Sequence, residues 1–321
     1  MSLEVAISSP AGSKFRDWPF IAICAVVLAW MTQPWQVIQP RDTLVLLISV
    51  GAVFGLLWWS DKYEREPLQT LMWAFLWGAF PACLFSYFLE GAVTTLSGGV
   101  IIEEGMKLLA LVVIFRRGSI DSWTDGLVMG GYIGLGFAAV EDLLYAISGE
   151  NAFDVLVTRG IFSIFAHTFF SGLGAVAIVI GLLRKRWWLV GVGFLLACFL
   201  HLTWNTVLAW ELFAYNVAGF LFFFSFLPPA ILLATAIFLR KRERHELLVE
   251  GKYAVEAGRM TEEQLWLVVD FRARRYARKQ LRGLEDKKAF NEQIYLNVQL
   301  LLSGELRESL PEISKNPEDY F

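Results

Sequence analysis

The chain has 321 residues, of which 56% are hydrophobic and 18% are charged, and its mean hydropathy is +0.51. This is far more apolar than a water-soluble domain of this length needs to fill a core, so the composition excludes an ordinary soluble protein and indicates a polytopic membrane protein. The net charge of −3, with the basic residues in short separate clusters, is too close to zero to argue for a nucleic-acid partner, so we expect the lipid bilayer and no nucleic acid as the surroundings of the chain.

Eight apolar stretches occupy most of the chain before residue 244. A helix needs about 20 mostly apolar residues to cross a bilayer. The stretches that qualify are 18–37, 43–60, 68–93, 98–115, 126–147, 156–182, 187–210 and 213–239. We therefore predict an all-α fold in which residues 1–244 form a transmembrane domain of about eight helices.

Basic residues mark alternate ends of these predicted spans. Lys14 and Arg16 precede the first span, and the clusters that follow the second, fourth, sixth and eighth are DKYERE (61–66), RR (116–117), RKR (184–186) and RKRER (240–244). In an eight-pass arrangement all of them fall on the same side of the bilayer. Because the loops of a membrane protein that are rich in Lys and Arg face the cytoplasm, both termini are predicted to lie inside.

Residues 245–321 mix charged and apolar residues, and we predict that they form a cytoplasmic helical tail. TEEQ (261–264) is a capping-box pattern that begins one helix. NEQIYLNVQLLL (291–302) is a second, amphipathic helix that can pack on the first. Between them, FRARRYARKQLR (271–282) is basic enough to lie against anionic headgroups, and a solvated helix face explains it equally well.

The fourth predicted span carries Glu103, Glu104 and Lys107 inside the apolar run GGVIIEEGMKLLALVVIF (98–115). An ionisable group at the bilayer centre costs about 2.5 to 3.5 kcal/mol on insertion scales, so such groups usually mark a pathway or a site. Both glutamates lie one helical turn from Lys107 and can reach it. One lysine cannot neutralise two carboxylates, so we expect the excess negative charge to have a further partner or a proton.

The fifth predicted span contains GFAAVED (136–142), which places Glu141 and Asp142 near its outer end. Three glycines on this span allow a neighbouring backbone to come close: Gly131, Gly134 and Gly136. Such close approach is how helices associate in a membrane. Glu141 is therefore a candidate for the same site as the fourth span, whereas Asp142 is also compatible with the interface.

Each of the next two predicted spans carries one histidine with a polar residue one turn away. His167 precedes Ser171 in the sixth span, and His201 precedes Asn205 in the seventh. Counted at 1.5 Å per residue, the histidines lie roughly 15 Å inside the outer boundary, and the glutamates of the fourth and fifth spans roughly 8 to 10 Å inside it. We therefore predict one shared polar cavity that opens outward.

Two imidazoles and a carboxylate are a sufficient ligand set for a catalytic Zn²⁺ ion that keeps one position open for water. The predicted zinc ligands are Glu141, His167 and His201, and the predicted catalytic residues are Glu103, Glu104, Lys107 and Asn205. Either Glu103 or Glu104 is the general base, and Lys107 keeps this carboxylate pair ionised. Asn205 supplies a donor for the oxyanion or orients the histidine one turn before it.

Two other schemes use overlapping residues. In a metal-free scheme a glutamate and a histidine activate the water jointly. A serine nucleophile is disfavoured, because His167 is stacked on the same helix face as Ser171 and the sequence contains no GxSxG-like turn.

At these residues the chain resembles the PrsW family of intramembrane proteases, which is similar in motif pattern to CAAX-prenyl endopeptidases and abortive-infection membrane proteins. The matching pieces, in order, are DKYEREP (61–67), EEGMK (103–107), GFAAVED (136–142), HTFFSG (167–172) and HLTWN (201–205). The resemblance implies a multi-pass metallo- or glutamate-type protease of the cell membrane, the cytoplasmic membrane in bacteria. Its substrates would be single-span membrane proteins such as anti-sigma factors, cut near the extracytoplasmic face. Asp142 departs from the family pattern, where we expect Asn, and the tail after Arg244 lies outside the match.

Three alternatives remain for the same polar residues. A zinc-dependent lipid amidase of the ceramidase kind would release an acyl chain instead of a cut peptide. A proton or ion transporter would use the carboxylates as a relay, although no broken spans repeat across the two halves of the sequence. A membrane scaffold without catalysis would need the charges only to hold helices together.

Overall fold

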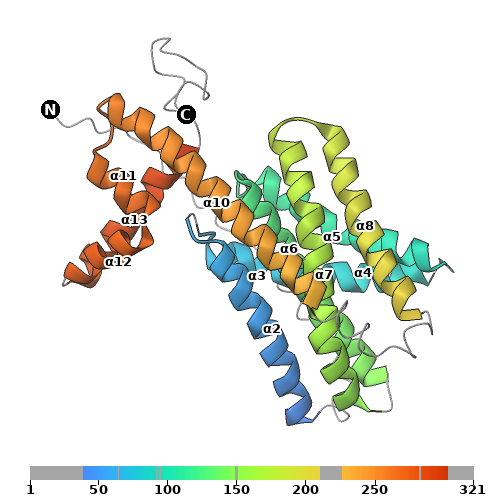
Figure 1. The fold of residues 1–321 in the computed structure, drawn as a ribbon. Coiled ribbons are helices and arrows are strands. Elements are labelled where there is room, and N and C mark those ends of the chain that lie inside the picture. The colour runs from blue at the N-terminus through green and yellow to red at the C-terminus, as the bar shows by residue number, and fades with distance from the viewer. Residues whose placement is uncertain are drawn as a thin grey trace.

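The computed structural model describes residues 39–63, 65–91, 93, 95–148, 151–209, 226–281 and 283–302. Within these residues every regular element is helical, which confirms the predicted all-α class (Figure 1). The helices before the tail are α2 (Pro40–Ser60), α3 (Leu68–Trp77), the π-helix η2 (Gly78–Ala82), α4 (Cys83–Glu90), α5 (Leu96–Arg116), α6 (Trp123–Ser148), α7 (Ala152–Leu183) and α8 (Trp187–Ala209). The helix α10 (Leu227–Glu256) leads from this bundle to α11 (Glu262–Val269), α12 (Phe271–Gln280) and α13 (Leu284–Leu302).

Five helices of the described chain are long and apolar enough to cross a membrane: α2, the continuous α3–η2–α4 helix, α6, α7, and α8 as far as Thr206. They coincide with the predicted spans 43–60, 68–93, 126–147, 156–182 and 187–210. The predicted span 98–115 is the helix α5, which is set apart from these five by the three charged residues Glu103, Glu104 and Lys107 inside its apolar run. The predicted span 18–37 and residues 213–225 of the predicted span 213–239 lie outside the described residues. The count of eight spans and the inside position of both termini therefore stay predictions.

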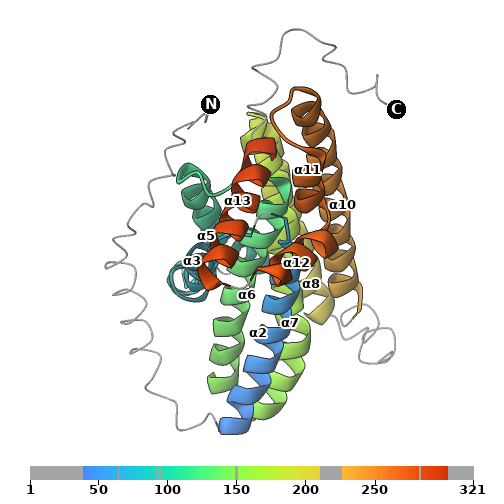
Figure 2. The ribbon, with the colours of Figure 1, turned by 90° about the vertical axis from the view of Figure 1, so that its left-hand side faces the viewer.

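The helix α6 lies at the centre of the bundle, with α7 alongside it and α3 and η2 against another face (Figures 1 and 2). A Cβ atom added at Gly136 would strike the carbonyl oxygen of Phe75 on α3, and one added at Gly134 would strike the carbonyl oxygen of His167 on α7. The predicted close backbone approach is therefore confirmed at these two glycines. Gly131 instead faces the side chain of Leu57 on α2.

Gly136→Ala is expected to destabilise the bundle by about 1–3 kcal/mol, because the added methyl group must push α3 away from α6. Gly55→Ala on α2 is the matched control, since nothing lies within 4 Å of the position of its added Cβ. Thermal unfolding of the two variants in detergent measures the difference. Equal unfolding midpoints would show that the close helix crossing at Gly136 does not exist.

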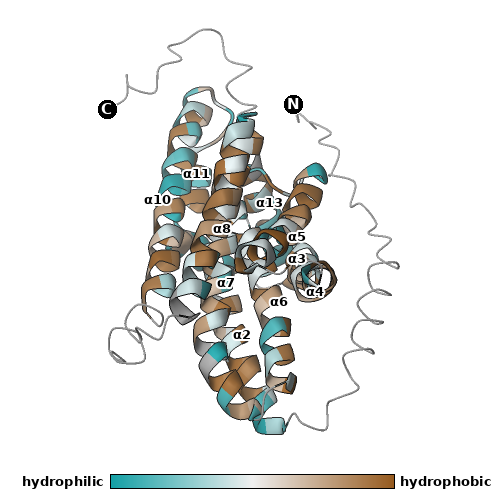
Figure 3. Ribbon diagram, turned by 90° about the vertical axis from the view of Figure 1, so that its right-hand side faces the viewer, coloured by the Kyte–Doolittle hydropathy of each residue, from teal (hydrophilic) through white to brown (hydrophobic). Residues whose placement is uncertain are grey.

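The helix α10 continues without a break across residue 244, so a single helix joins the bundle to the tail. The Thr124 hydroxyl, at the start of α6, donates a hydrogen bond to the buried carboxyl of Glu243 on α10 (3.3 Å). Burial, together with the nearby Asp61, raises the pKa of Glu243 to about 8. Figure 3 shows that α10 becomes more hydrophilic toward the tail, whereas the bundle helices are mostly hydrophobic. The change in polarity along α10 places its C-terminal part outside the apolar layer.

The tail helices begin as the sequence predicts. The Thr261 side chain accepts a hydrogen bond from the Gln264 backbone, and the Gln264 side chain accepts one from the Thr261 backbone, which confirms the capping box. A break at Asp270 then starts α12, where two backbone N–H groups of its first turn bind the Asp270 carboxylate and lower its pKa. The predicted packing of the last helix on the first is confirmed, since Leu265 and Ile294 belong to one buried apolar cluster.

Candidate functional site

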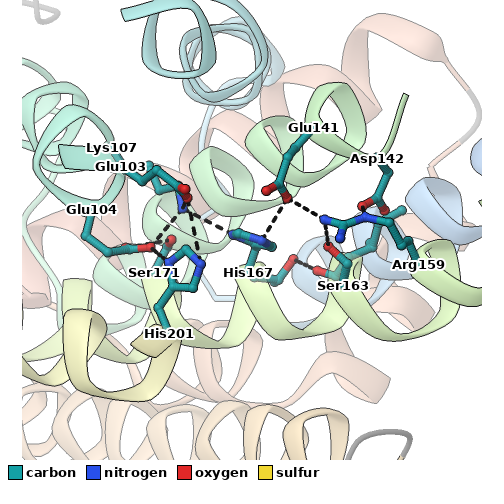
Figure 4. A network of polar contacts seen from close by, with 12 residues as sticks. Glu103, Glu104, Lys107, Glu141, Asp142, Arg159, Ser163, His167, Ser171 and His201 are labelled. Atoms are coloured by element: carbon teal, nitrogen blue, oxygen red, sulfur yellow. Dashed lines mark hydrogen bonds and ion pairs between the residues drawn. The ribbon is translucent and has the colours of Figure 1, made fainter. Parts of the chain in front are cut away.

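Four neighbouring helices bring six of the seven predicted site residues into one polar network (Figure 4). Glu103, Glu104 and Lys107 come from α5, Glu141 from α6, His167 from α7 and His201 from α8. Glu104, Lys107 and the two histidines are each at most 3% exposed. Charged and polar groups buried this deeply need partners inside the protein, and the network provides them.

Glu104 is the most fully paired carboxylate of the network. Its Oε1 accepts a hydrogen bond from Lys107 Nζ (2.8 Å) and lies 2.9 Å from His201 Nδ1, and its Oε2 accepts one from Ser171 Oγ (3.4 Å). Because an ionised carboxylate only accepts, Nδ1 of His201 must carry the ring proton, which leaves the lone pair on Nε2. The Phe170 ring stacks on the His201 ring with centroids 5.3 Å apart and fixes its plane.

Glu141 holds the other histidine in a similar way. Its Oε2 lies 3.1 Å from His167 Nε2 and accepts a hydrogen bond from Arg159 Nη2 (2.8 Å). The lone pair of the His167 ring is therefore on Nδ1, where it accepts a hydrogen bond from Lys107 Nζ (3.2 Å). Each imidazole thus needs a single N–H for its contacts, and each is oriented by a different glutamate.

Arg159 on α7 is a site residue that the sequence reasoning missed. Its guanidinium bridges Glu141 and Asp142, and its Nε lies 2.7 Å from Asp142 Oδ1. The Asp142 side chain is 0% exposed, so it is a buried member of this network. The sequence does contain a signal that could have identified Arg159. It is a lone arginine near the start of an apolar span, and the preceding span carries two adjacent carboxylates.

Glu103 differs from its neighbour Glu104 because one of its buried oxygens has no hydrogen-bond partner among the described residues. Its Oε2 lies 3.7 Å from both Lys107 Nζ and His201 Nε2, which is beyond hydrogen-bonding distance. No described residue supplies a closer partner. The Glu103 side chain is 12% exposed, compared with 2% for Glu104. Of the two adjacent glutamates, Glu103 is therefore the one that can hold a water molecule.

Glu103, His167 and His201 are the residues whose spacing suits a metal ion. One ligand atom from each lies within 4.8 Å of the others, and no second group of this kind occurs in the described part of the chain. The sequence prediction assigned Glu141 to the ligand set, whereas the group with suitable spacing in the structure contains Glu103 in its place. Glu141 lies 3.1 Å from His167 Nε2. Two imidazoles and a carboxylate are typical ligands of a catalytic zinc ion.

Asn205 is the predicted site residue that the structure does not bring into the network. It lies one turn after His201 on α8 and is partly buried. Among the contacts of the described residues, none joins its side chain to the six others. His201 is oriented by Glu104 instead. The oxyanion role predicted for Asn205 therefore stays a prediction.

A cavity of about 360 Å³ lies beside the network, between the α3–η2–α4 helix, α5 and α6. Glu103 and Glu141 line it, and most of the other lining side chains are apolar, among them Phe80, Leu84 and Val140. A concave, mostly apolar space with a few polar groups is typical of a ligand-binding site. Glu103, the glutamate with an unpaired oxygen, thus faces a space large enough for a ligand.

Carboxylates and histidines that meet beside an apolar cavity in a helical membrane protein form a candidate site for the activation of water. The family model described as "PrsW family intramembrane metalloprotease" matches residues 66–232, which is more than half of the chain and includes the whole network. The chain therefore belongs to the PrsW family of intramembrane proteases, as its five ordered motifs predict.

Curated relatives carry the same family name. The chain is 27% identical over 197 residues to the protease PrsW of Geobacillus kaustophilus, covering 54% of this chain and 85% of the relative. It is 29% identical over 146 residues to that of Clostridioides difficile (40% and 61%) and 31% identical over 126 residues to that of Bacillus subtilis (33% and 57%). No solved structure matches the chain. These relatives support intramembrane protease activity.

Proposed function

We propose that the protein is an endopeptidase that hydrolyses a peptide bond of single-span membrane proteins of the anti-sigma-factor kind, near the extracytoplasmic face. The observation that carries the proposal is the meeting of Glu103, His167 and His201 beside a cavity that Glu103 lines. Family membership supports peptide hydrolysis over the lipid amidase and the ion transporter that the residues alone also allow.

Each side chain of the network has its own role in the proposed hydrolysis. Glu103 holds the attacking water with its free oxygen, on the side of the lone pair of His201 Nε2. Glu104 and Glu141 orient the two imidazoles before the substrate arrives, which avoids reorganisation during the reaction. Lys107 offsets the charge of Glu104, since an unpaired carboxylate is costly at this depth.

For the cofactor we propose a divalent metal ion, Zn²⁺ by donor type, held by Glu103, His167 and His201. The spacing of the three donor atoms and the lone pair of His201 Nε2 support this set. When bound, such an ion polarises the peptide carbonyl and lowers the pKa of a water molecule. Glu141 lines the same cavity and is then the carboxylate that accepts the proton of the water.

One contact favours a metal-free version of the same hydrolysis. Lys107 Nζ already donates to His167 Nδ1 at 3.2 Å, and a metal ion on His167 would have to replace this hydrogen bond. In this version Glu103 itself accepts the proton of the water, with His201 beside it. The two versions differ in metal content and in the role of Glu141, so an experiment can separate them.

Cleavage is tested with purified protein in proteoliposomes together with the single-span anti-sigma factors of the same organism, each tagged at both ends. The wild type is expected to release two tagged fragments from at least one of them, and Glu103→Gln to release none. Wild-type protein that cuts none of these substrates would overturn the proposal. Release of an acyl chain or uptake of ions in the same vesicles would favour one of the two rival activities.

Glu103→Gln is expected to lose the metal, whereas Glu141→Gln is expected to keep it with roughly 10-fold weaker affinity, because Glu141 orients His167 and is not itself a ligand in this set. Both variants should lose cleavage. Metal analysis of the purified variants after equilibration with zinc measures this difference. Loss of the metal in Glu141→Gln but not in Glu103→Gln would instead support the ligand set predicted from the sequence. A wild type that is active without metal would support the version in which Glu103 is the base.

A further inference from the structure

The cavity contains polar atoms that the network does not use. The Ser86 side chain on α4 is 2% exposed, and its Oγ has no hydrogen-bond partner among the described residues. Oε1 of Glu90 also has no hydrogen-bond partner among the described residues, although the Glu90 carboxyl group lies within hydrogen-bonding reach of Glu103. Both residues line the cavity together with Glu103 and its free Oε2. A buried polar atom without a partner costs roughly 1–3 kcal/mol, so these three oxygens together point to a missing partner.

Two helix faces form most of the wall of the cavity. The residues on the α3–η2–α4 face are Ala79, Cys83, Ser86 and Glu90, and those on the α6 face are Phe137, Glu141, Leu144 and Ser148. Both sets have spacings of four, three and four residues, so each lies along one side of its helix. The first helix widens into the π-helix η2 where Pro81 lacks a backbone N–H. The cavity is therefore an elongated space between two helices that reaches the catalytic carboxylates.

A peptide substrate inside the bilayer has a special requirement. While it is helical its backbone groups are paired and its carbonyl carbons are shielded, so it must unwind locally before hydrolysis. An unwound segment leaves N–H and C=O groups that lipid cannot satisfy, and it is tolerated only where protein or water supplies partners. The hydroxyl of Ser86 can donate or accept a hydrogen bond, and the carboxylate of Glu90 can accept one. The apolar lining, including Leu84 and Leu144, suits the side chains of a transmembrane segment.

We propose that this cavity is the substrate cleft, in which Ser86 and Glu90 hydrogen-bond the backbone of an unwound apolar segment and place its scissile carbonyl beside Glu103. The inference rests on the proposed peptidase function and adds the site where the substrate binds. Ser86 and Glu90 are binding residues in this scheme, and they take no part in the chemistry.

A native cysteine allows a direct test of occupancy. Cys83 lines the cavity, whereas Cys198 on α8 is buried but does not line it. Two enzymes are made in the Glu103→Gln background, each keeping one of these cysteines and lacking the other two of the chain. The substrate that the wild type cleaves then receives a single cysteine at successive positions around the cleaved bond. Under oxidation, disulfides are expected with Cys83 at one or two adjacent positions and with Cys198 at none.

Kinetics provide the second readout. Ser86→Ala and Glu90→Leu are each expected to raise KM about 3- to 10-fold, the effect of one lost hydrogen bond, with kcat changed less than about threefold and with unchanged metal content. Leu144→Trp, which fills the cavity, should lower kcat/KM further. Phe88→Ala is the control, because Phe88 is 63% exposed on another face of α4.

The outcomes separate this inference from the function on which it rests. Normal KM values in Ser86→Ala, Glu90→Leu and Leu144→Trp, together with no disulfide to Cys83, would overturn the proposal that the cavity is the substrate cleft. If the wild type still cleaves the substrate, the peptidase function stands. Disulfides that form equally with Cys198 would also overturn it. A wild type that cleaves no substrate would overturn both.

Discussion

The Glu104→Gln variant is expected to lose peptide cleavage together with about 3–5 kcal/mol of folding free energy, the usual cost of breaking a buried ion pair. Glu104 is 2% exposed and lies 2.8 Å from Lys107 Nζ and 2.9 Å from His201 Nδ1. A neutral amide would leave the buried ammonium of Lys107 with Glu103 at 3.7 Å as its nearest described carboxylate. Unfolding of the purified variant in mixed detergent micelles measures the loss of stability.

The double variant Glu104→Gln with Lys107→Gln is the matched control for this effect. It removes both charges, so no unpaired ion stays buried, and most of the lost stability should return. Cleavage should not return, because His201 no longer has a carboxylate to fix the proton on Nδ1. A double variant as unstable as the single one would show that the charge of Lys107 is not what Glu104 holds in place.

His201→Ala is expected to lower the rate of cleavage by roughly 10²–10⁴-fold, the range for removal of a group that activates or transfers a proton. The His201 ring is 1% exposed and its Nε2 faces Glu103 at 3.7 Å, where the attacking water is proposed to lie. His245→Ala is the control, since this third histidine lies on α10 in the basic segment that leads to the tail. Cleavage of the tagged substrate in proteoliposomes measures both rates.

Stability must be measured beside activity in the His201 variant. The unfolding midpoint should fall by much less than in Glu104→Gln, because removal of the His201 ring leaves Lys107 paired with Glu104. Full activity in both His167→Ala and His201→Ala would exclude the proposed chemistry, with or without a metal ion.

The members of the site could be found in the sequence because ionisable residues are costly inside apolar spans. Long hydrophobic runs are interrupted by Glu103, Glu104, Lys107 and the two histidines. Ionisable and polar residues inside membrane spans usually mark a functional site. The same reasoning overlooked Arg159, which lies near the N-terminal end of α7, where an arginine is also compatible with the membrane–water interface. Its partnership with Glu141 and Asp142 depends on how α7 crosses α6.

The roles of the two adjacent glutamates could not be read from the sequence. Neighbouring residues on a helix point about 100° apart, so only the rotation of α5 against α8 decides which of them meets His201 Nδ1. In the structure Glu104 turns toward His201 and Ser171, and Glu103 turns toward the cavity. The same rotation places Glu103 in the candidate metal set and leaves Glu141 to orient His167.

The sequence by itself determined the membrane class, the all-helical fold, five of the spans and the polar residues that form the site. These features follow from hydropathy and charge along the chain, which are local properties. The tertiary structure decided which carboxylate pairs with which histidine, which oxygen stays free, and that Ser86 and Glu90 face the same cavity as Glu103. These features depend on the rotation and close approach of whole helices, which glycines such as Gly134 and Gly136 permit but whose direction no single span specifies.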